Sequence, residues 1–127
     1  MEDLIHRTKR SQKLSKSKRL KKKKDFRFKS FKRFKTESFM FILGLEGKGR
    51  LGISISKKVL SSAVARNRIK RLIRETFRKN AKLFPKTDLN IIGRDNLSKE
   101  WKLLDYSDVQ KQLISAARFV EENKKSE

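Results

Sequence analysis

The chain has 127 residues, of which 36 are Lys or Arg and 14 are Asp or Glu, so its formal net charge at pH 7 is +22. We expect one modest domain whose self-repulsion needs a polyanionic partner, with nucleic acid favoured over an anionic membrane. The absence of cysteine excludes disulfides, thiolate metal sites and cysteine nucleophiles. The one histidine, His6, lies among basic tail residues, where a catalytic base is not expected.

The two ends of the chain are predicted to lie outside the folded domain. Residues 1–19 mix Lys, Arg and Ser with few apolar side chains, which predicts a disordered basic tail. We expect the domain over residues 20–121 and a flexible C-terminus over residues 122–127. The longest apolar run, Phe39–Leu45, is much shorter than the roughly 20 residues that span a bilayer, and no signal-peptide pattern is present. We therefore expect a cytoplasmic protein without membrane attachment.

Aromatic and basic residues are interleaved between Asp25 and Lys35, and this stretch is predicted to be a short helix or turn packed on the domain. Its four aromatic residues are Phe26, Phe28, Phe31 and Phe34. Helical spacing does not place all four on one side, so two roles stay open: most fill the core, and one or two remain available to stack on RNA bases.

A strand hairpin is predicted in the next segment. Phe39–Leu45 is an apolar run typical of a buried strand, and Gly47 and Gly49 allow a turn into a second strand. Apolar side chains of this second strand alternate with small or hydroxylated ones at Gly52, Ser54 and Ser56. Its small-residue face is flat enough for another backbone to approach closely.

The central helix is predicted to have one core face and one cationic face. Ser61 or Ser62 can cap it, and it should run to about Phe84, before Pro85. At about 100° per residue, the core face contains Ala65, Ile69, Leu72, Ile73, Thr76 and Phe77. The other face contains Asn67, Lys70, Arg71, Arg74 and Arg78. Like charges one turn apart cost stability, and arginine can bind phosphate bidentately, so this face favours a compensating nucleic acid.

The C-terminal part is predicted to hold a third strand over residues 88–94 and a last helix through about Glu121. Ser107 and Gln110 form a candidate capping box for that helix. Its expected buried stripe is Val109, Leu113, Ala116, Ala117 and Val120.

The acidic residues of this part give no sign of an enzyme site. They are Asp88, Asp95, Glu100, Asp105 and Asp108, and they lack the spacing of metal ligands. We therefore predict no catalytic and no metal-binding residue in the protein. The residues alone indicate a small basic RNA-binding domain; a ribosomal protein or an RNA chaperone fits this composition, and a membrane-active cationic protein fits it less well.

The segment from Gly52 to Phe77, GISISKKVLSSAVARNRIKRLIRETF, resembles the signature of the bacterial ribonuclease P protein family. The RNR motif of that family is matched by Arg66-Asn67-Arg68, followed by Ile69-Lys70-Arg71 and Arg74. A strand ending at Ser56-Lys57-Lys58 precedes the motif at the family's usual distance. The wider likeness covers roughly residues 20–120.

The resemblance implies a fold and a function. The fold is an α/β (α+β) two-layer sandwich with about four mostly antiparallel strands, three helices and a left-handed βαβ crossover through the RNR helix. The protein would be the subunit of ribonuclease P that binds the catalytic RNA and the 5′ leader of precursor tRNA. The RNA subunit would carry catalysis of leader removal and hold most of the Mg²⁺, with no organic cofactor and no obligate protein partner.

The resemblance also implies two sets of contact residues. Carried over by position, the catalytic RNA would contact Lys57, Lys58, Arg66, Asn67, Arg68, Lys70, Arg71 and Arg74. The leader would bind between the first helix and the sheet, at Phe26, Phe31, Phe39, Phe41, Ser54 and Ser56. The sequence departs from the family at Ser30, where relatives usually have a second aromatic residue, and at Ile42, where some have one.

Overall fold

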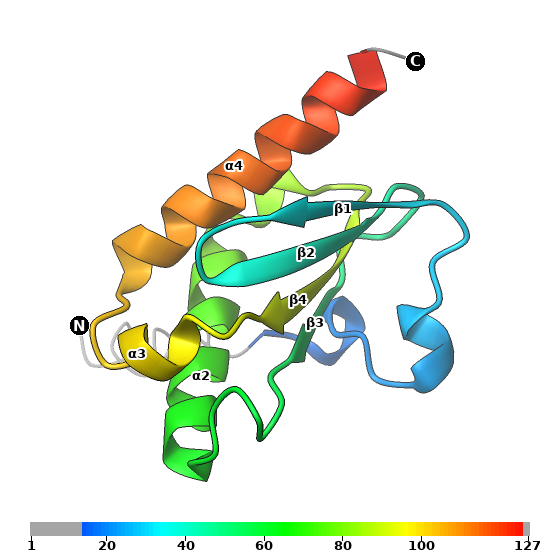
Figure 1. Cartoon of the computed structure of the whole chain (residues 1–127). Coiled ribbons are helices and arrows are strands. Elements are labelled where there is room, and N and C mark those ends of the chain that lie inside the picture. Colours follow the sequence, from blue (N-terminus) through cyan, green and yellow to red (C-terminus); the bar gives the residue numbers. More distant parts are fainter. Residues whose placement is uncertain (1–13, 126–127) are drawn as a thin grey trace, which may run out of the picture.

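The computed structural model describes residues 14–125, with the strands, helices and 3-10 turns of Figure 1. The strands are β1 (Phe31–Lys35), β2 (Phe39–Gly44), β3 (Leu51–Ser54) and β4 (Asp88–Gly93). The helices are α2 (Ala63–Lys79), α3 (Leu97–Glu100) and α4 (Tyr106–Lys125). The short 3-10 turns are η1 (Lys16–Lys18), η2 (Lys23–Phe26) and η3 (Ala81–Leu83).

The four strands form one mixed sheet in the order β1-β2-β4-β3. The pairs β1–β2 and β2–β4 are antiparallel, whereas β3 and β4 are parallel neighbours joined through α2. Figure 1 shows α2 and α4 together on one side of the sheet. The predicted α+β sandwich with a mostly antiparallel sheet is therefore confirmed for the described chain, while the left-handedness of the crossover stays a prediction.

The hydrophobic core lies between one face of the sheet and the two long helices. In β2, Phe39, Phe41 and Leu43 are each 0% exposed, and they alternate with half-buried Met40 and Ile42. The core face of α2 is buried at Ala65, Ile69, Ile73, Thr76 and Phe77, and the stripe of α4 is buried at Val109, Leu113, Ala116, Ala117 and Val120. Since each large apolar side chain contributes about 1.5–3 kcal/mol when buried, this layer holds the sheet and helices together. Both predicted helical stripes are confirmed, except that Leu72 of α2 is half-buried and packs at the border of the core.

The predicted hairpin between the second and third strands is wrong. β4 lies between β2 and β3, and the hairpin partner of β2 is β1, a strand where a helix or turn was expected. The connection after β2 bonds to the residues that begin β4: the Gly47 N–H donates to the Lys86 carbonyl at 2.8 Å. The same connection donates from the Lys48 and Arg50 N–H groups to the Asp88 carboxylate at 3.0 and 2.8 Å. These bonds direct β3 to the far side of β4.

The helix ends differ from the sequence prediction at three of four points. Ser62 caps α2 as expected, since its hydroxyl accepts the Ala65 N–H at 3.3 Å. The helix ends at Lys79 because the Asn80 side-chain amide donates to the Thr76 carbonyl at 2.7 Å, and only the short η3 follows. The cap of α4 is a reciprocal Asp105–Asp108 pair, at 3.0 and 3.1 Å, and not Ser107 with Gln110. α4 also runs to Lys125, beyond the expected end at about Glu121, while the flexibility of residues 122–127 stays a prediction.

The N-terminal boundary is also earlier than predicted. Leu14 is 5% exposed and Arg19 forms a parallel bridge with Leu51, so residues 14–19 belong to the folded domain. They do so because Leu14 and Leu20 supply the apolar surface that the basic residues between them lack. The rest of the predicted tail, residues 1–13, lies outside the described residues.

Candidate nucleic-acid interface

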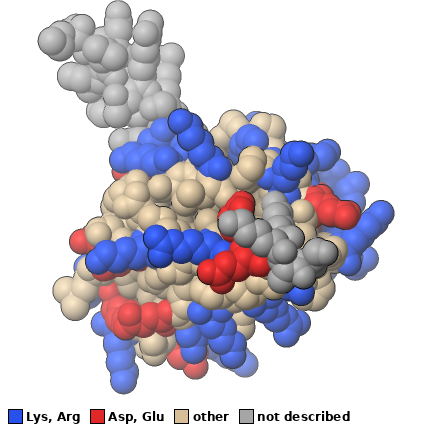
Figure 2. Space-filling model, turned by 90° about the horizontal axis from the view of Figure 1, so that it is seen from above, with Lys and Arg blue, Asp and Glu red and all other residues tan. Residues whose placement is uncertain are grey.

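The cationic face of α2 lies opposite the buried stripe that anchors the helix to the sheet. Asn67, Arg71 and Arg74 are exposed, and Lys70 is half-buried. Within residues 14–125, the structure shows no ion pair or hydrogen bond for the side chains of Lys70, Arg71 and Arg74. Lys70, Arg71 and Arg74 are therefore available to an anionic ligand. On the face of the molecule seen from above in Figure 2, Lys and Arg also spread widely, while acidic residues form smaller groups.

Two arginines of the RNR motif already bind the protein's own backbone. Arg66 donates from Nη1 to the carbonyls of Leu60 and Ser61, at 2.7 and 2.9 Å, and so fixes the entry to α2. Arg68 donates to three carbonyls of the α3–α4 connection. These acceptors are Trp101 at 3.1 Å, Lys102 at 3.3 Å and Leu104 at 3.0 Å. Both arginines therefore stabilise the fold. The motif alone does not show this role, because the carbonyl acceptors lie outside it.

The turn between β3 and α2 presents two further cations. Lys57 and Lys58 are exposed there, and Ser56 closes the turn because its carbonyl accepts the N–H groups of Val59 and Leu60, each at 3.1 Å. The Ser56 hydroxyl also accepts the Val59 N–H at 3.3 Å. The turn thus extends the basic surface of α2 toward the end of β3.

A second surface is the open face of the sheet, which the helices do not cover. Strand alternation and register place Met40, Ile42, Asn90, Ile92 and Ser54 on this face. The Ser54 hydroxyl donates to Oδ1 of Asn90 at 3.2 Å. The face is therefore apolar along β2 and polar toward β3.

Aromatic rings lie over this open face at two glycines. A Cβ added at Gly52 would lie 2.3 Å from Cε1 of Phe26, and one added at Gly44 would lie 2.9 Å from Cγ of Phe28. Only glycine allows these close approaches. The small-residue face predicted for β3 is thus covered at Gly52 by the ring of Phe26 from the same chain. Phe31 pairs with Gly44 on the same face and is 45% exposed, with the Arg33 guanidinium 5.8 Å from its ring centroid.

The prediction that Phe39 and Phe41 contact a ligand is wrong. Both side chains are 0% exposed and point to the helices. An uninterrupted apolar strand does not reveal which alternate residues face the core, and here Met40 and Ile42 take the open side. Of the other predicted residues of this group, Phe26 lies half-buried on the sheet, while Phe31, Ser54 and Ser56 are exposed.

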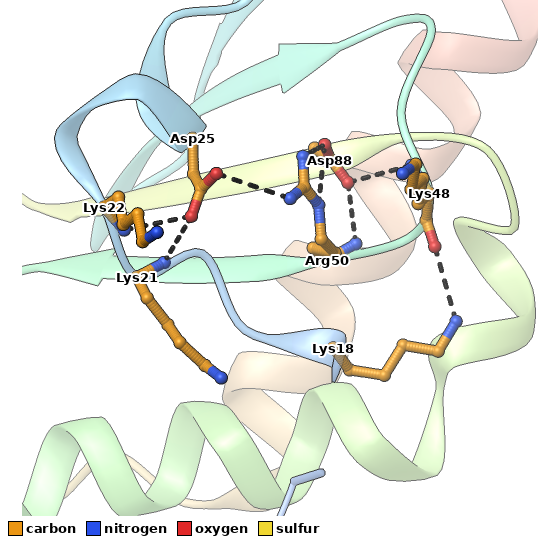
Figure 3. Close-up of polar contacts among 7 residues, drawn as sticks. All are labelled: Lys18, Lys21, Lys22, Asp25, Lys48, Arg50 and Asp88. Carbon is orange, nitrogen blue, oxygen red and sulfur yellow. Dashed lines mark hydrogen bonds and ion pairs between the residues drawn. The ribbon is translucent and has the colours of Figure 1, made fainter. Parts of the chain in front are cut away.

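An ion-pair network fixes the segment that carries Phe26 (Figure 3). Asp25 accepts the backbone N–H groups of Lys21 and Lys22 at 3.0 and 2.9 Å. The Arg50 guanidinium lies between two carboxylates, 3.6 Å from Asp25 and 2.8 Å from Asp88. Because Arg50 precedes β3 and Asp88 begins β4, this network ties the aromatic segment to both strands.

The buried end of this network keeps its charge. Burial raises the pKa of Asp88, but hydrogen bonds from the Arg50 side chain and from the Arg50 and Lys48 N–H groups outweigh it, so that the pKa is lowered overall. The bond with Asp88 likewise raises the pKa of Arg50. Asp88 is therefore an ionised acceptor that serves the fold.

The described residues offer neither a metal cluster nor a membrane span. No three His, Asp or Glu side chains of residues 14–125 converge in a way that could hold a metal ion. In the same range, no helix has the length and apolar character needed to cross a bilayer. Asp25 and Asp88 form ion pairs with Arg50, and Asp105 and Asp108 cap α4.

Taken together, the unpaired Lys70, Arg71 and Arg74 of α2 and the aromatic open face define a small α+β protein whose surfaces are of the kind that suits RNA. The sequence pattern of the family described as Ribonuclease P matches residues 14–120. The chain belongs to the ribonuclease P family.

Relatives and solved structures agree with this membership. The chain is 44% identical over 74 residues to a ribonuclease P protein component of Legionella pneumophila, an alignment that covers 57% of this chain and 63% of that protein. It is 33% identical to the component of Thermotoga maritima, over 71% of this chain and 79% of the relative. The structure of the Staphylococcus aureus RNase P protein superposes with a TM-score of 0.66 at 31% identity, covering 82% of this chain and 95% of that one.

The role of Asp88 predicts a pH-dependent stability. Its pKa is lowered on folding, so its contribution is present above the unfolded pKa of about 3.9 and is lost as the pH falls through the folded value. Asp88→Asn should lower the free energy of unfolding by about 1–2 kcal/mol at pH 7, measured with urea, and by much less at pH 3. Exposed Asp95→Asn is the control and should change little at either pH. An equal loss from Asp88→Asn at both pH values would contradict this role.

The bonds of Arg68 predict that replacing Arg68 and replacing Arg71, both on α2, affect the stability of the protein differently. Arg68→Ala should lower the free energy of unfolding by about 1–2 kcal/mol, because three carbonyls lose a charged donor. Arg71→Ala, on the same helix and exposed, should change it by less than about 0.5 kcal/mol. Urea unfolding of both variants measures this, and equal effects would show that the Arg68 bonds do not stabilise the loop.

Proposed function

We propose that this chain is the protein subunit of ribonuclease P and assists a catalytic RNA in removing the 5′ leader from precursor tRNA. The observation that carries this proposal is the family match over residues 14–120, because that range contains both the cationic face of α2 and the aromatic open face. A ribosomal or chaperone role is not favoured, since the relatives are ribonuclease P protein components.

The cationic face of α2 would bind the catalytic RNA. Lys70, Arg71 and Arg74 have no acidic partner within the described chain, so phosphates could displace their counterions without breaking an ion pair. Lys57 and Lys58 would extend the contact beyond the helix. Asn67 and the free N–H donors of Arg66 and Arg68 would add to this contact, because a guanidinium has five donors.

The open face of the sheet would bind the leader as a single strand. Phe26 and Phe28 lie over Gly52 and Gly44 of this face, and Phe31 extends from β1 on the same face. Stacking of a base on such a ring contributes about 1–3 kcal/mol. Stacking is largely independent of sequence, which suits a leader that differs from one tRNA gene to the next. Ser54, joined to Asn90, offers polar contacts near Phe26.

The chain's own part would be binding and charge neutralisation, while the RNA subunit would carry the chemistry and hold most of the Mg²⁺. This division is supported by the use of the described acids: Asp25 and Asp88 pair with Arg50, and Asp105 and Asp108 cap α4. The cationic surface would lower the repulsion between two RNAs that must approach closely. The enzyme would act in the cytoplasm, with no organic cofactor and no obligate protein partner.

The direct test is cleavage of a 5′-labelled precursor tRNA at low Mg²⁺ by a bacterial ribonuclease P RNA, with and without this protein. We expect cleavage at the mature 5′ end that needs both components. Cleavage by the protein alone would contradict the division of labour. A lack of stimulation with several bacterial RNAs, together with co-sedimentation with ribosomal subunits, would favour a ribosomal role.

The leader-binding role of the open face predicts a substrate-dependent loss. Phe31→Ala should weaken binding of the holoenzyme to precursor tRNA by about 1–3 kcal/mol and leave mature tRNA unaffected. Phe31 is 45% exposed, so the change should leave the fold intact. Leu103→Ala is the control, because this residue is 81% exposed and lies on the α3–α4 connection. Equal losses on both tRNAs would contradict a leader contact.

A further inference from the structure

A small basic cavity lies between the outer edge of β3, where residues 19 and 20 pair with Leu51, and the cationic face of α2. Its volume is about 120 Å³, and its basic lining residues are Arg19, Lys70 and Arg74. Its neutral lining residues are Leu14, Leu20, Phe26, Leu51, Gly52 and Ile53. No acidic side chain of the described chain lines it. Three positive charges therefore surround one apolar-walled space.

The cations come from two elements with fixed positions. Arg19 is held on β3 by its bridge to Leu51, where the Leu20 N–H donates to the Leu51 carbonyl at 2.8 Å. Lys70 and Arg74 lie one turn apart on α2, whose opposite side is anchored in the core. The three groups are thus preorganised, and bringing them together costs free energy through like-charge repulsion.

The donors of this cavity are not satisfied within the described chain. Nε of Arg19 is buried and has no hydrogen-bond partner there. Although Arg74 is exposed as a residue, partial desolvation of its guanidinium lowers its pKa, and the nearby Arg19 charge lowers it further. A buried charged donor without an acceptor is unfavourable, so the arrangement calls for an anion with several acceptor oxygens.

We propose that this cavity binds one phosphate group of an RNA backbone through Arg19, Lys70 and Arg74. Phosphate provides acceptors in several directions, which matches guanidinium donors from two sides. The volume is below the roughly 300–1,000 Å³ of typical small-molecule pockets, so a single phosphate fits the space better than a nucleoside. The proposal rests on the proposed function only for the source of that phosphate.

The cavity also connects the two candidate RNA surfaces. Phe26 lines it and at the same time covers Gly52 on the open face of the sheet, while Lys70 and Arg74 belong to the cationic face of α2. A phosphate bound here would lie at the boundary between the catalytic RNA and the leader. Either RNA could supply it, since the chemistry of the group is the same.

The first experiment uses the full-length protein alone with inorganic phosphate, so it does not depend on ribonuclease P activity. NMR of the arginine Nε–H groups should show a saturable shift for Arg19. Arg19→Gln and, as a second variant on an exposed helical position, Arg74→Gln should each weaken phosphate binding about tenfold or more. Circular dichroism establishes that the variants are folded.

The matched control is Arg118→Gln, which removes the same charge from an exposed position on α4. It should leave phosphate binding nearly unchanged. An equal loss in this control, or no saturable shift of the Arg19 Nε–H, would overturn the proposal, because either result means that phosphate responds only to the net charge.

The second experiment identifies the source with Arg19→Gln in the reconstituted holoenzyme. A weaker affinity of the protein for the catalytic RNA, independent of leader length, assigns the phosphate to that RNA. A loss seen only for precursor tRNAs with leaders assigns it to the leader. Unchanged binding of both RNAs would overturn the role in RNA binding, whereas failure of the unaltered protein to support any cleavage would count against the proposed function and not against the site.

Discussion

The ion pairs of the Arg50 guanidinium with Asp25 and Asp88 are the interaction on which both candidate RNA surfaces depend. Asp88 is nearly buried at the start of β4 and also accepts the N–H groups that lead into β3, so it fixes the parallel edge of the sheet. Through Arg50 the same carboxylate reaches Asp25, next to Phe26. The network therefore sets both the sheet edge beside α2 and the ring that covers the open face.

The charge balance of the chain explains why this network matters. With a net charge of +22, the molecule has few carboxylates, and several of those described are used in caps and ion pairs. In the described chain, Lys70, Arg71 and Arg74 of α2 are left without ion-pair partners and repel one another. The domain thus forgoes the stability that ion pairs at these positions would add and keeps a surface suited to a polyanion.

The sequence predicted which faces of the two long helices are buried, because the 3.6-residue period of Ile69, Ile73 and Phe77 separates core from surface locally. It failed where long-range pairing decides. β1 was missed since Phe31 and Phe34 lie on opposite faces, and Phe34 stacks on Phe119 of α4 at 4.9 Å between centroids.

The candidate site was likewise predictable where it depends on local sequence and not where it depends on tertiary contacts. The resemblance located the RNR residues, but not the bonds of Arg68 to the α3–α4 connection, which depend on segments far apart in the sequence. The buried state of Phe39 and Phe41 and the ordered Leu14 also depend on tertiary packing. The apolar run itself predicted a buried strand, and it was the resemblance that placed Phe39 and Phe41 at a ligand, because it does not tell which alternate side chains face the core. Composition placed Leu14 in the tail because it averages over a segment, whereas a single apolar residue can anchor the chain.

The central claim is that one small domain presents two surfaces to two different RNAs. It is tested most directly by photo-crosslinking in a holoenzyme bound to precursor tRNA, with p-benzoylphenylalanine placed at position 31 or at position 71. We expect position 31 to crosslink to the leader and position 71 to the catalytic RNA. Crosslinks from both positions to the same RNA would contradict the claim.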